Sequence, residues 1–156
     1  MNQPPKSLKR PDGTYLVTVT EVNCINRANV QVPEKEVQRW MERFDHRRTL
    51  PVEYNPRRSR SEREDQEQTN LDQVGVTLKD FFFQRIGTRT FLMAQAALAG
   101  PKSADAQTVL DQPDGNWFFG MVAYTTLTSP SYQMGDSQYP QQLRKIIAFD
   151  LVSQPI

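Results

Sequence analysis

The residues best placed to carry chemistry are one histidine and a group of serines. His46 is the only histidine in the 156 residues. A serine becomes a nucleophile when a histidine within hydrogen-bond reach takes its proton and a carboxylate orients that histidine. A hydrolase could be assembled from His46 with partners drawn from Ser129, Ser131, Ser137, Asp45 and Asp136. The structural alternative is that His46, beside two arginines at the end of an amphipathic helical segment, is exposed and interacts with the helix dipole.

Metal, thiol and nucleotide chemistry have less support in the sequence. With one histidine and one cysteine, Cys24, the chain lacks the ligands of a structural zinc site. Its aspartates form no compact ligand motif, and its seven glycines are scattered without a phosphate-binding loop. Cys24 follows an alternating strand pattern, which favours a small packed residue over a reactive thiol. The sequence therefore predicts no metal site and no cofactor.

Arginines gather in one part of the sequence. The whole chain has a formal net charge of +1, so it produces no strong long-range field. Six arginines form a candidate contact surface that could meet phosphate groups, namely Arg47, Arg48, Arg57, Arg58, Arg60 and Arg63. Much of this charge is neutralised by four neighbouring carboxylates, Glu62, Glu64, Asp65 and Glu67. We therefore expect protein contacts here and do not expect nucleic-acid binding.

The elements that must position these residues follow from the hydrophobic pattern. Alternation or short apolar runs predict strands over residues 15–22, 50–54, 74–83, 88–98, 117–125 and 145–152. A helix starting near Glu34, with its apolar stripe packed on the core, is predicted by the helical spacing of Val37, Trp40, Met41 and Phe44. A second short helix is expected over 104–112 with Ser103 as its N-cap. The alanine-rich segment 88–98 would also suit a helix.

The length and composition fit one domain over residues 1–156, with 37% hydrophobic and 24% charged residues. Three segments are expected outside the regular elements: a leader over 1–13, a charged loop over 57–68 and a polar loop over 126–143. The expected fold class is α+β, a mostly antiparallel sheet or barrel of about six to seven strands with two short helices. No apolar run suits a signal peptide or a membrane span, so no membrane contact is expected.

Several short stretches follow one another in an order seen in one group of viral enzymes. They are Asn26-Arg27, Pro33, Glu53-Tyr54-Asn55-Pro56, Gly100-Pro101, Gly120-Met121-Val122-Ala123-Tyr124 and Phe149-Asp150-Leu151-Val152-Ser153-Gln154-Pro155. Over about residues 15–155, their order and local sequence resemble those of the prohead (capsid maturation) proteases of tailed bacteriophages. The fold of those proteases is related to that of herpesvirus assembly proteases. The resemblance therefore implies a prohead-protease-like fold.

The resemblance also implies where catalytic residues would stand. In that family a Glu-x-Asn-His-Pro type segment carries the catalytic histidine, whereas here Asn55 is followed directly by Pro56. A Gly-Val-Ser-Ser-Arg-Gly type strand carries the serine nucleophile, whereas the matching segment here has Val122 and Ala123. The resemblance thus implies no catalytic residue and a vestigial cleft formed by Tyr54, Asn55, Val122, Ala123, Tyr124 and Asp150.

The expected function is that of a non-enzymatic bacteriophage structural protein. It would make protein–protein contacts in the head as a minor capsid, decoration or assembly component, located in the virion or the host cytoplasm. The expected partners are capsid or other virion proteins, and self-association stays open. Two alternatives also stay open. The first is a phage accessory or inhibitor protein that binds a host or viral partner or a small ligand, and the second is an active serine protease with relocated catalytic residues.

Overall fold

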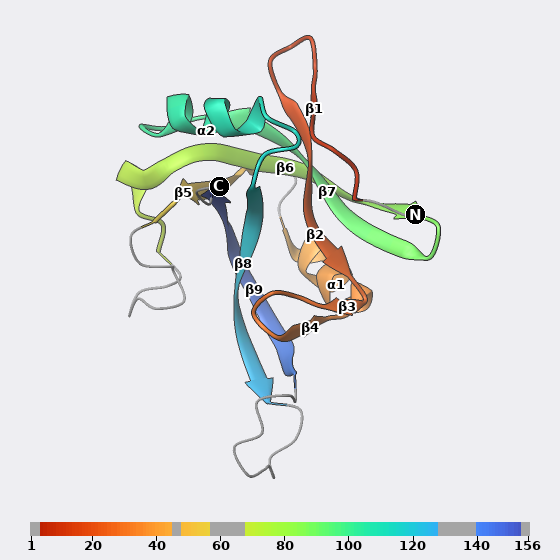
Figure 1. Ribbon diagram of the computed structural model, residues 1–156. Coiled ribbons are helices and arrows are strands. Elements are labelled where there is room, and N and C mark those ends of the chain that lie inside the picture. The colour runs from red at the N-terminus through yellow and green to blue at the C-terminus, as the bar shows by residue number, and fades with distance from the viewer. Residues whose placement is uncertain (1–3, 45–47, 57–67, 128–139, 154–156) are drawn as a thin grey trace.

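The computed structural model describes residues 4–44, 48–56, 68–127 and 140–153. In these ranges, nine strands form one curled sheet, a half-barrel accompanied by two α-helices and one 3₁₀ helix (Figure 1). The strands are β1 Leu8–Lys9, β2 Tyr15–Val22, β3 Cys24–Ile25, β4 Val30–Val32, β5 Leu50–Tyr54, β6 Val74–Ile86, β7 Arg89–Leu98, β8 Trp117–Leu127 and β9 Gln141–Ser153. The helices are α1 Glu34–Arg43, η2 Leu71–Gln73, which is the 3₁₀ helix, and α2 Ser103–Leu110.

The sheet is mixed. Its strands follow the order β1-β2-β7-β6-β5-β9-β4-β3, and β8 also pairs with β9. The pairings of β4 and β5 with β9 are parallel, and the others are antiparallel. The α+β class is confirmed, but the expectation of about six to seven strands is too low and two pairings are parallel. The missed strands β1, β3 and β4 have only two or three residues each, too few for a periodic signal.

The longer elements lie where the hydrophobic pattern predicts them. The predicted hairpin is β6–β7, and the alanine-rich arm is a strand because β7 pairs with β2 on one edge and with β6 on the other. This two-sided pairing overrides the helix propensity of alanine. The second predicted helix is α2, but Ser103 is its first residue rather than its cap, since Lys102 stands at the N-cap without a side-chain hydrogen bond.

Two expected segment boundaries change in the structure. The leader over 1–13 contains β1, whose residue Leu8 pairs with Leu16 of β2. The polar loop is shorter than 126–143 because β8 extends to Leu127 and β9 begins at Gln141. Of the charged loop over 57–68, only Gln68 is described.

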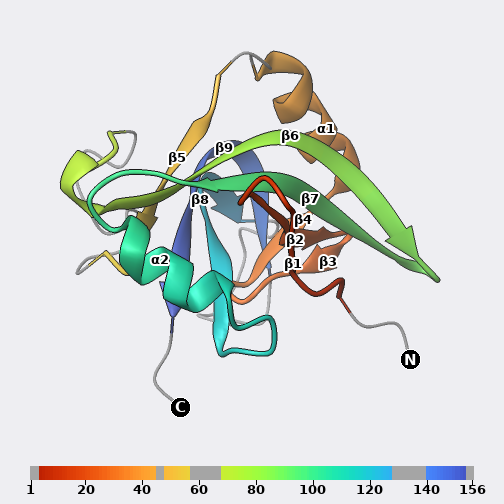
Figure 2. The same ribbon diagram turned by 90° about the horizontal axis from the view of Figure 1, so that it is seen from above.

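The apolar stripe of α1 packs on the core, as predicted. Val37 is fully buried, and Trp40, Met41 and Phe44 pack against the core cluster while partly exposed. The Trp40 ring centroid lies 4.9 Å from that of Phe81 and 6.0 Å from that of Phe149, both in edge-on geometry. Helices α1 and α2 lie far apart on the curved sheet in both views (Figure 1 and Figure 2). Helix α1 packs against β9, and helix α2 packs against β6 and β7.

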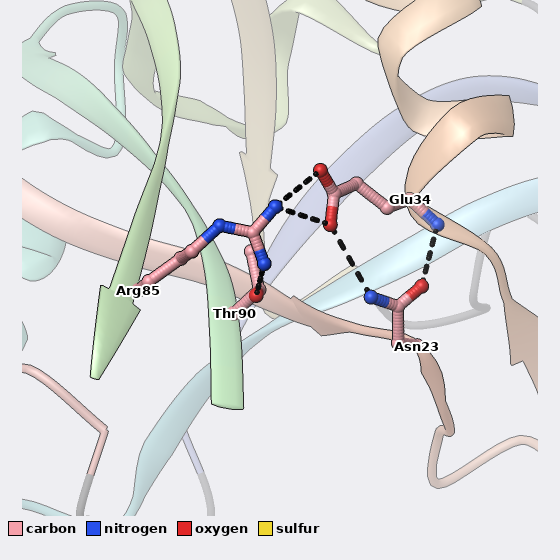
Figure 3. A network of polar contacts seen from close by, with 4 residues as sticks. All are labelled: Asn23, Glu34, Arg85 and Thr90. Atoms are coloured by element: carbon pink, nitrogen blue, oxygen red, sulfur yellow. Dashed lines mark hydrogen bonds and ion pairs between the residues drawn. The ribbon is translucent and has the colours of Figure 1, made fainter. Parts of the chain in front are cut away.

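A polar network fixes the first turn of α1 to the β6–β7 hairpin (Figure 3). The Asn23 side chain accepts a hydrogen bond from the Glu34 backbone N–H at 3.0 Å and donates one to Glu34 Oε1 at 3.2 Å. Arg85 donates to both Glu34 carboxylate oxygens, at 3.3 and 3.1 Å, and to Thr90 Oγ1 at 3.0 Å. The network thus holds together a turn, a helix start and a hairpin that are distant in the sequence.

Candidate functional site

The segments that resemble the catalytic parts of the protease family meet around β9. Glu53 of β5 pairs with Asp150 of β9, and Gly120 of β8 pairs with the same Asp150 from the other edge. Directly paired residues on neighbouring strands project toward the same face of a sheet. The three residues therefore form one row across three strands that are far apart in the sequence.

The two carboxylates in this row are buried. Glu53 is 0% exposed and Asp150 is 3% exposed. Glu53 Oε2 accepts a hydrogen bond from the backbone N–H of Asn70 at 3.0 Å, which joins the row to the segment before η2. A carboxylate pair can act on a substrate only where the substrate can reach it. In the described residues, both carboxylates are shielded from solvent.

Asn55 forms hydrogen bonds with the backbone of β9 at the end of β5. It adopts a left-handed conformation with φ of 40°, which asparagine tolerates better than most residues. Its N–H donates to the Leu151 carbonyl at 2.9 Å, and its Oδ1 accepts from the Ser153 N–H at 2.7 Å. The position where the resemblance puts the histidine-bearing segment is thus a turn that ties β5 to the end of β9.

The other residues of the predicted vestigial cleft lie along β8. Val122 is buried and pairs with Ala148, Ala123 pairs with Ile146, and the exposed Tyr124 pairs with Lys145. Lys145 precedes Asp150 by five residues, which corresponds to about 16 Å along a strand. The structure therefore brings Tyr54, Asn55 and Asp150 together and places Tyr124 well apart from them. Whether these residues line a shared cleft stays a prediction.

The hydrolase candidates of the sequence lie outside the described residues. These are His46, Ser129, Ser131, Ser137, Asp45 and Asp136. The described part of the chain contains no histidine, so no serine–histidine pair can be built from it. On β8, the hydroxyl of Thr125 is engaged by the side chain of Gln141. The prediction that the chain has no catalytic residue stays a prediction.

The predicted arginine surface is almost entirely outside the described residues as well. Of its six members, only Arg48 is described, and it is exposed. The described residues contain no group of three or more histidine, cysteine, aspartate or glutamate side chains that could hold a metal ion. Among the described helices, none is long and apolar enough to cross a membrane.

The structure reveals a cleft that the sequence did not predict. It has a volume of about 930 Å³ and lies between the start of β8 and the edge formed by β2 and β3. We call it the β8 cleft, and its walls are formed by Pro4–Ser7, Thr18–Glu21, Cys24–Ala28, Arg89, Phe91, Pro113, Asp114 and Trp117–Met121. Gly120 and Met121 also belong to the segment that resembles the nucleophile strand. The cleft therefore shares two residues with that segment.

The wall of the β8 cleft combines aromatic rings with paired charges. The guanidinium of Arg27 lies 4.1 Å from the ring centroid of Phe118, a cation–π contact. In the same cleft, Arg89 donates to both oxygens of the Glu21 carboxylate at 3.0 and 2.7 Å. Such a surface offers apolar stacking area with few unbalanced charges. It is suited to binding peptide or other partly apolar groups.

Cys24 is the thiol in this cleft, and its surroundings keep it protonated. Burial raises the pKa of the Cys24 thiol, and the neighbouring Glu21 carboxylate raises it further, although Arg89 acts in the opposite direction. The sulfur also lies 3.6 Å from the Glu21 carbonyl oxygen. Since the thiolate is the nucleophile, this environment does not favour thiol catalysis. The prediction of a small packed residue at a strand end agrees with this placement in β3.

Two segments of the cleft wall, Asn26-Arg27 and Trp117–Phe119, are far apart in the sequence. Of the three aromatic residues, Phe119 is buried while Trp117 and Phe118 are partly exposed. No signal in the sequence indicates that Arg27 lies over Phe118, since 91 positions separate them. Only the sheet brings them together.

Comparison with solved structures identifies the fold of the chain, whereas comparison of sequences identifies no family. No family model matches the chain, and no curated protein matches it. The chain matches a solved structure of a capsid assembly protease, so it has a prohead-protease-like fold. That solved structure is of the bacteriophage T4 capsid assembly protease, gp21. The match has a TM-score of 0.57 and covers 99% of this chain and 94% of that chain.

The low sequence identity of this match limits which properties of the neighbour can be inferred for this chain. The two sequences are 16% identical, so the likeness shows the fold alone. It confirms the prohead-protease-like fold that the resemblance implies. The activity, the partners and the catalytic residues of this chain must be argued from its own side chains.

Proposed function

We propose that the chain is a non-enzymatic bacteriophage structural protein that keeps a protease-like fold for protein–protein contacts in the phage head. It would act as a minor capsid, decoration or assembly component, in the virion or the host cytoplasm. Its partners would be capsid or other virion proteins. The likeness to a phage capsid assembly protease supports the phage setting, and the side chains around β9 support the loss of chemistry.

The observation that supports the proposal is the set of residue types in the two segments that flank Asp150. The segment resembling the nucleophile strand has Gly120, the buried Val122 and Ala123, and therefore offers no serine. The segment resembling the histidine loop has Asn55, whose side chain is used by the backbone of β9. Acyl transfer by this mechanism needs a nucleophile and a base within reach of each other, and neither residue type is present at these positions.

The β8 cleft supports protein binding in place of catalysis. Its Arg27–Phe118 stack and its Glu21–Arg89 pair are formed before any partner arrives. Pre-formed contacts lower the entropic cost of association. The same cleft favours the second candidate function, an accessory or inhibitor protein that binds a host or viral partner or a small ligand there. An active serine protease with relocated residues is the third outcome that experiment must separate.

The catalytic question can be tested on the purified full chain. We expect no labelling by a serine-reactive fluorophosphonate probe and no cleavage of head proteins, as measured by intact-mass spectrometry. The matched control is His46→Ala, which removes the only histidine. Labelling at Ser129, Ser131 or Ser137 that disappears in His46→Ala would show an active hydrolase and overturn the proposal.

The binding question can be tested by site-specific crosslinking in infected cells. A photoreactive phenylalanine analogue replaces Phe118 in the β8 cleft, and in a control protein it replaces Leu71, an exposed apolar residue outside the cleft. We expect a capsid or virion protein to crosslink from position 118 and not from position 71, and the chain to be found in purified virions. A crosslinked host or non-virion protein, with no chain in virions, would favour the accessory protein.

A further inference from the structure

A second cavity lies between α1 and β9, away from the β8 cleft. It has a volume of about 540 Å³, and none of its residues lines the first cavity. We call it the basic groove, and it is lined by Glu36, Arg39, Trp40, Arg43, Phe44, Leu143, Arg144, Lys145 and Ile146. Helix α1, one wall of this groove, is held at its first turn by the Glu34–Arg85 network (Figure 3).

The groove concentrates positive charge. Four cationic side chains and a single carboxylate line it, whereas the entire chain has a net charge of only +1. The carboxylate, Glu36, already binds Arg39 at 2.8 Å. Within the described part of the chain, Arg43 and Arg144 have no ion-pair partner. Two exposed cations at the mouth of a cavity are therefore available to an anionic group.

The positions of these cations reduce the regularity or the stability of the elements that carry them. Arg39 and Arg43 are four positions apart on α1, a spacing at which like charges destabilise a helix. On β9, Lys145 pairs with Tyr124 and Leu143 pairs with Thr125, so Arg144 is an extra residue in a β-bulge. A bulge interrupts the alternation of a strand and re-aims side chains. It lets the consecutive residues Arg144 and Lys145 both line the groove.

The floor of the groove is apolar. Trp40 and Phe44 are partly exposed, with ring centroids 5.5 Å apart, and Leu143 and Ile146 are buried beside them. Trp40 packs edge-on against the core residues Phe81 and Phe149, and these contacts hold the floor of the groove in place. An apolar side chain of a partner could be covered here while charged neighbours meet the rim.

We propose that the basic groove is a docking site for an acidic peptide segment of a protein partner, with an aromatic or aliphatic side chain between its carboxylates. The charges on the rim complement such a segment, and the apolar floor receives its central side chain. A peptide fits better than a nucleic-acid backbone because the apolar floor between the cations can receive a side chain and because the chain has little net charge. The proposal rests on the proposed function only in that the partner is a protein.

The test measures fluorescence anisotropy of dye-labelled probes with the full chain. The first probe is a short peptide in which aspartates and glutamates flank one tryptophan, and the second has asparagine and glutamine in their place. The third is a single-stranded oligonucleotide. We expect the acidic peptide to bind, with an affinity that falls as salt is added, and the amide peptide to bind at least about tenfold more weakly.

Charge-reversal variants locate the site. Arg43→Glu and Arg144→Glu together should weaken binding of the acidic peptide by about tenfold or more. Lys35→Glu is the control, because this exposed residue of α1 lies outside the groove and its reversal changes the net charge in the same direction, by half as much as the double variant. Arg43→Gln and Arg144→Gln keep the test valid if a reversal disturbs folding, which circular dichroism would detect.

Several results would overturn the proposal. They are equal affinity for the acidic and amide peptides, equal weakening by Lys35→Glu and by the groove variants, or tight binding of the oligonucleotide with none of the acidic peptide. These outcomes can be distinguished from results that would overturn the proposed function. A hydrolase identified by the serine probe could still dock an acidic segment here, and a non-enzyme could fail to do so.

Discussion

The contact between Tyr15 and Asp111 gives a quantitative prediction about alkaline stability. Tyr15 starts β2 and is 1% exposed, and its hydroxyl donates a hydrogen bond to Asp111 Oδ1 just after α2. Burial raises the pKa of Tyr15, and the hydrogen bond and the negative charge of Asp111 raise it further, from 10.0 to about 12. Each factor favours the neutral phenol, so the folded protein holds this proton more tightly than the unfolded chain does.

The direction of the pH effect follows from proton linkage. Below pH 10 both states keep the phenol protonated, and the contribution of Tyr15 to stability is fully present. As the pH rises from 10 toward about 12, the unfolded chain loses the proton first and the free energy of unfolding decreases. A shift of this size corresponds to roughly 2–3 kcal/mol of unfolding free energy. That contribution is lost once the folded protein has also ionised.

The measurement is urea unfolding followed by tryptophan fluorescence, over the pH range from neutral to about 12. Tyr15→Phe should lower stability near neutral pH by about 1 kcal/mol, the usual value of a hydrogen bond, and should remove the Tyr15 part of the alkaline decline. Asp111→Asn should give an intermediate curve, because burial remains while the charge is lost. Lys9, whose Nζ lies 3.7 Å from Asp111 Oδ1, is present in both the parent and Tyr15→Phe proteins, so their difference isolates the phenol.

Parallel stability curves for the parent and Tyr15→Phe proteins above pH 10 would refute this reasoning. They would mean that the phenol titrates alike in the folded and unfolded states. Absorbance of tyrosinate offers an independent check. The parent protein should show a tyrosinate transition near pH 12 that is absent from the Tyr15→Phe protein.

Two further predictions concern the cleft and a backbone turn. Burial and the Glu21 carboxylate both raise the pKa of Cys24, so Glu21→Gln should speed alkylation of this thiol by iodoacetamide at neutral pH. The control Glu36→Gln on α1 should leave the rate of alkylation unchanged. A parent thiol as reactive as free cysteine would contradict this prediction. Gly100→Ala should cost at least about 2 kcal/mol, because its φ is +85° and a Cβ would lie 2.5 Å from the Val74 carbonyl oxygen. Gly13→Ala, at φ +88° with open space around it, should cost only about 1 kcal/mol, and equal losses of unfolding free energy would count against the role of the close contact.

Much of the fold was predictable because its long elements have simple periodicities. The alternation of Tyr15–Val22 and the helical stripe after Pro33 each bury one face, so the sequence records the burial directly. The short strands escaped prediction because they are defined by their partners rather than by their own pattern. Cys24–Ile25 is a strand only because Val30–Val32 lies beside it. The same holds for Leu8–Lys9, which pairs with the start of β2.

The candidate site was predictable to a smaller extent. The motif order led to the right fold, and it pointed to Glu53–Asn55 and Asp150, which the parallel pairing of β5 and β9 does bring together. It did not indicate that Glu53 and Asp150 are buried side by side, or that Tyr124 lies farther along β8, opposite Lys145 of β9. Strand register decides both points, and register depends on bulges that a single sequence does not reveal.

By itself, the sequence determined which residues are present: one histidine, one cysteine, and no serine in the segment from Gly120 to Tyr124. It also determined the apolar periodicity that makes the long strands and α1. The tertiary structure alone decided the neighbours, setting Arg27 over Phe118 and Arg144 beside α1. The physical reason is that periodicity reports which face of an element is buried, whereas a binding site depends on the pairing and register of elements far apart in the chain.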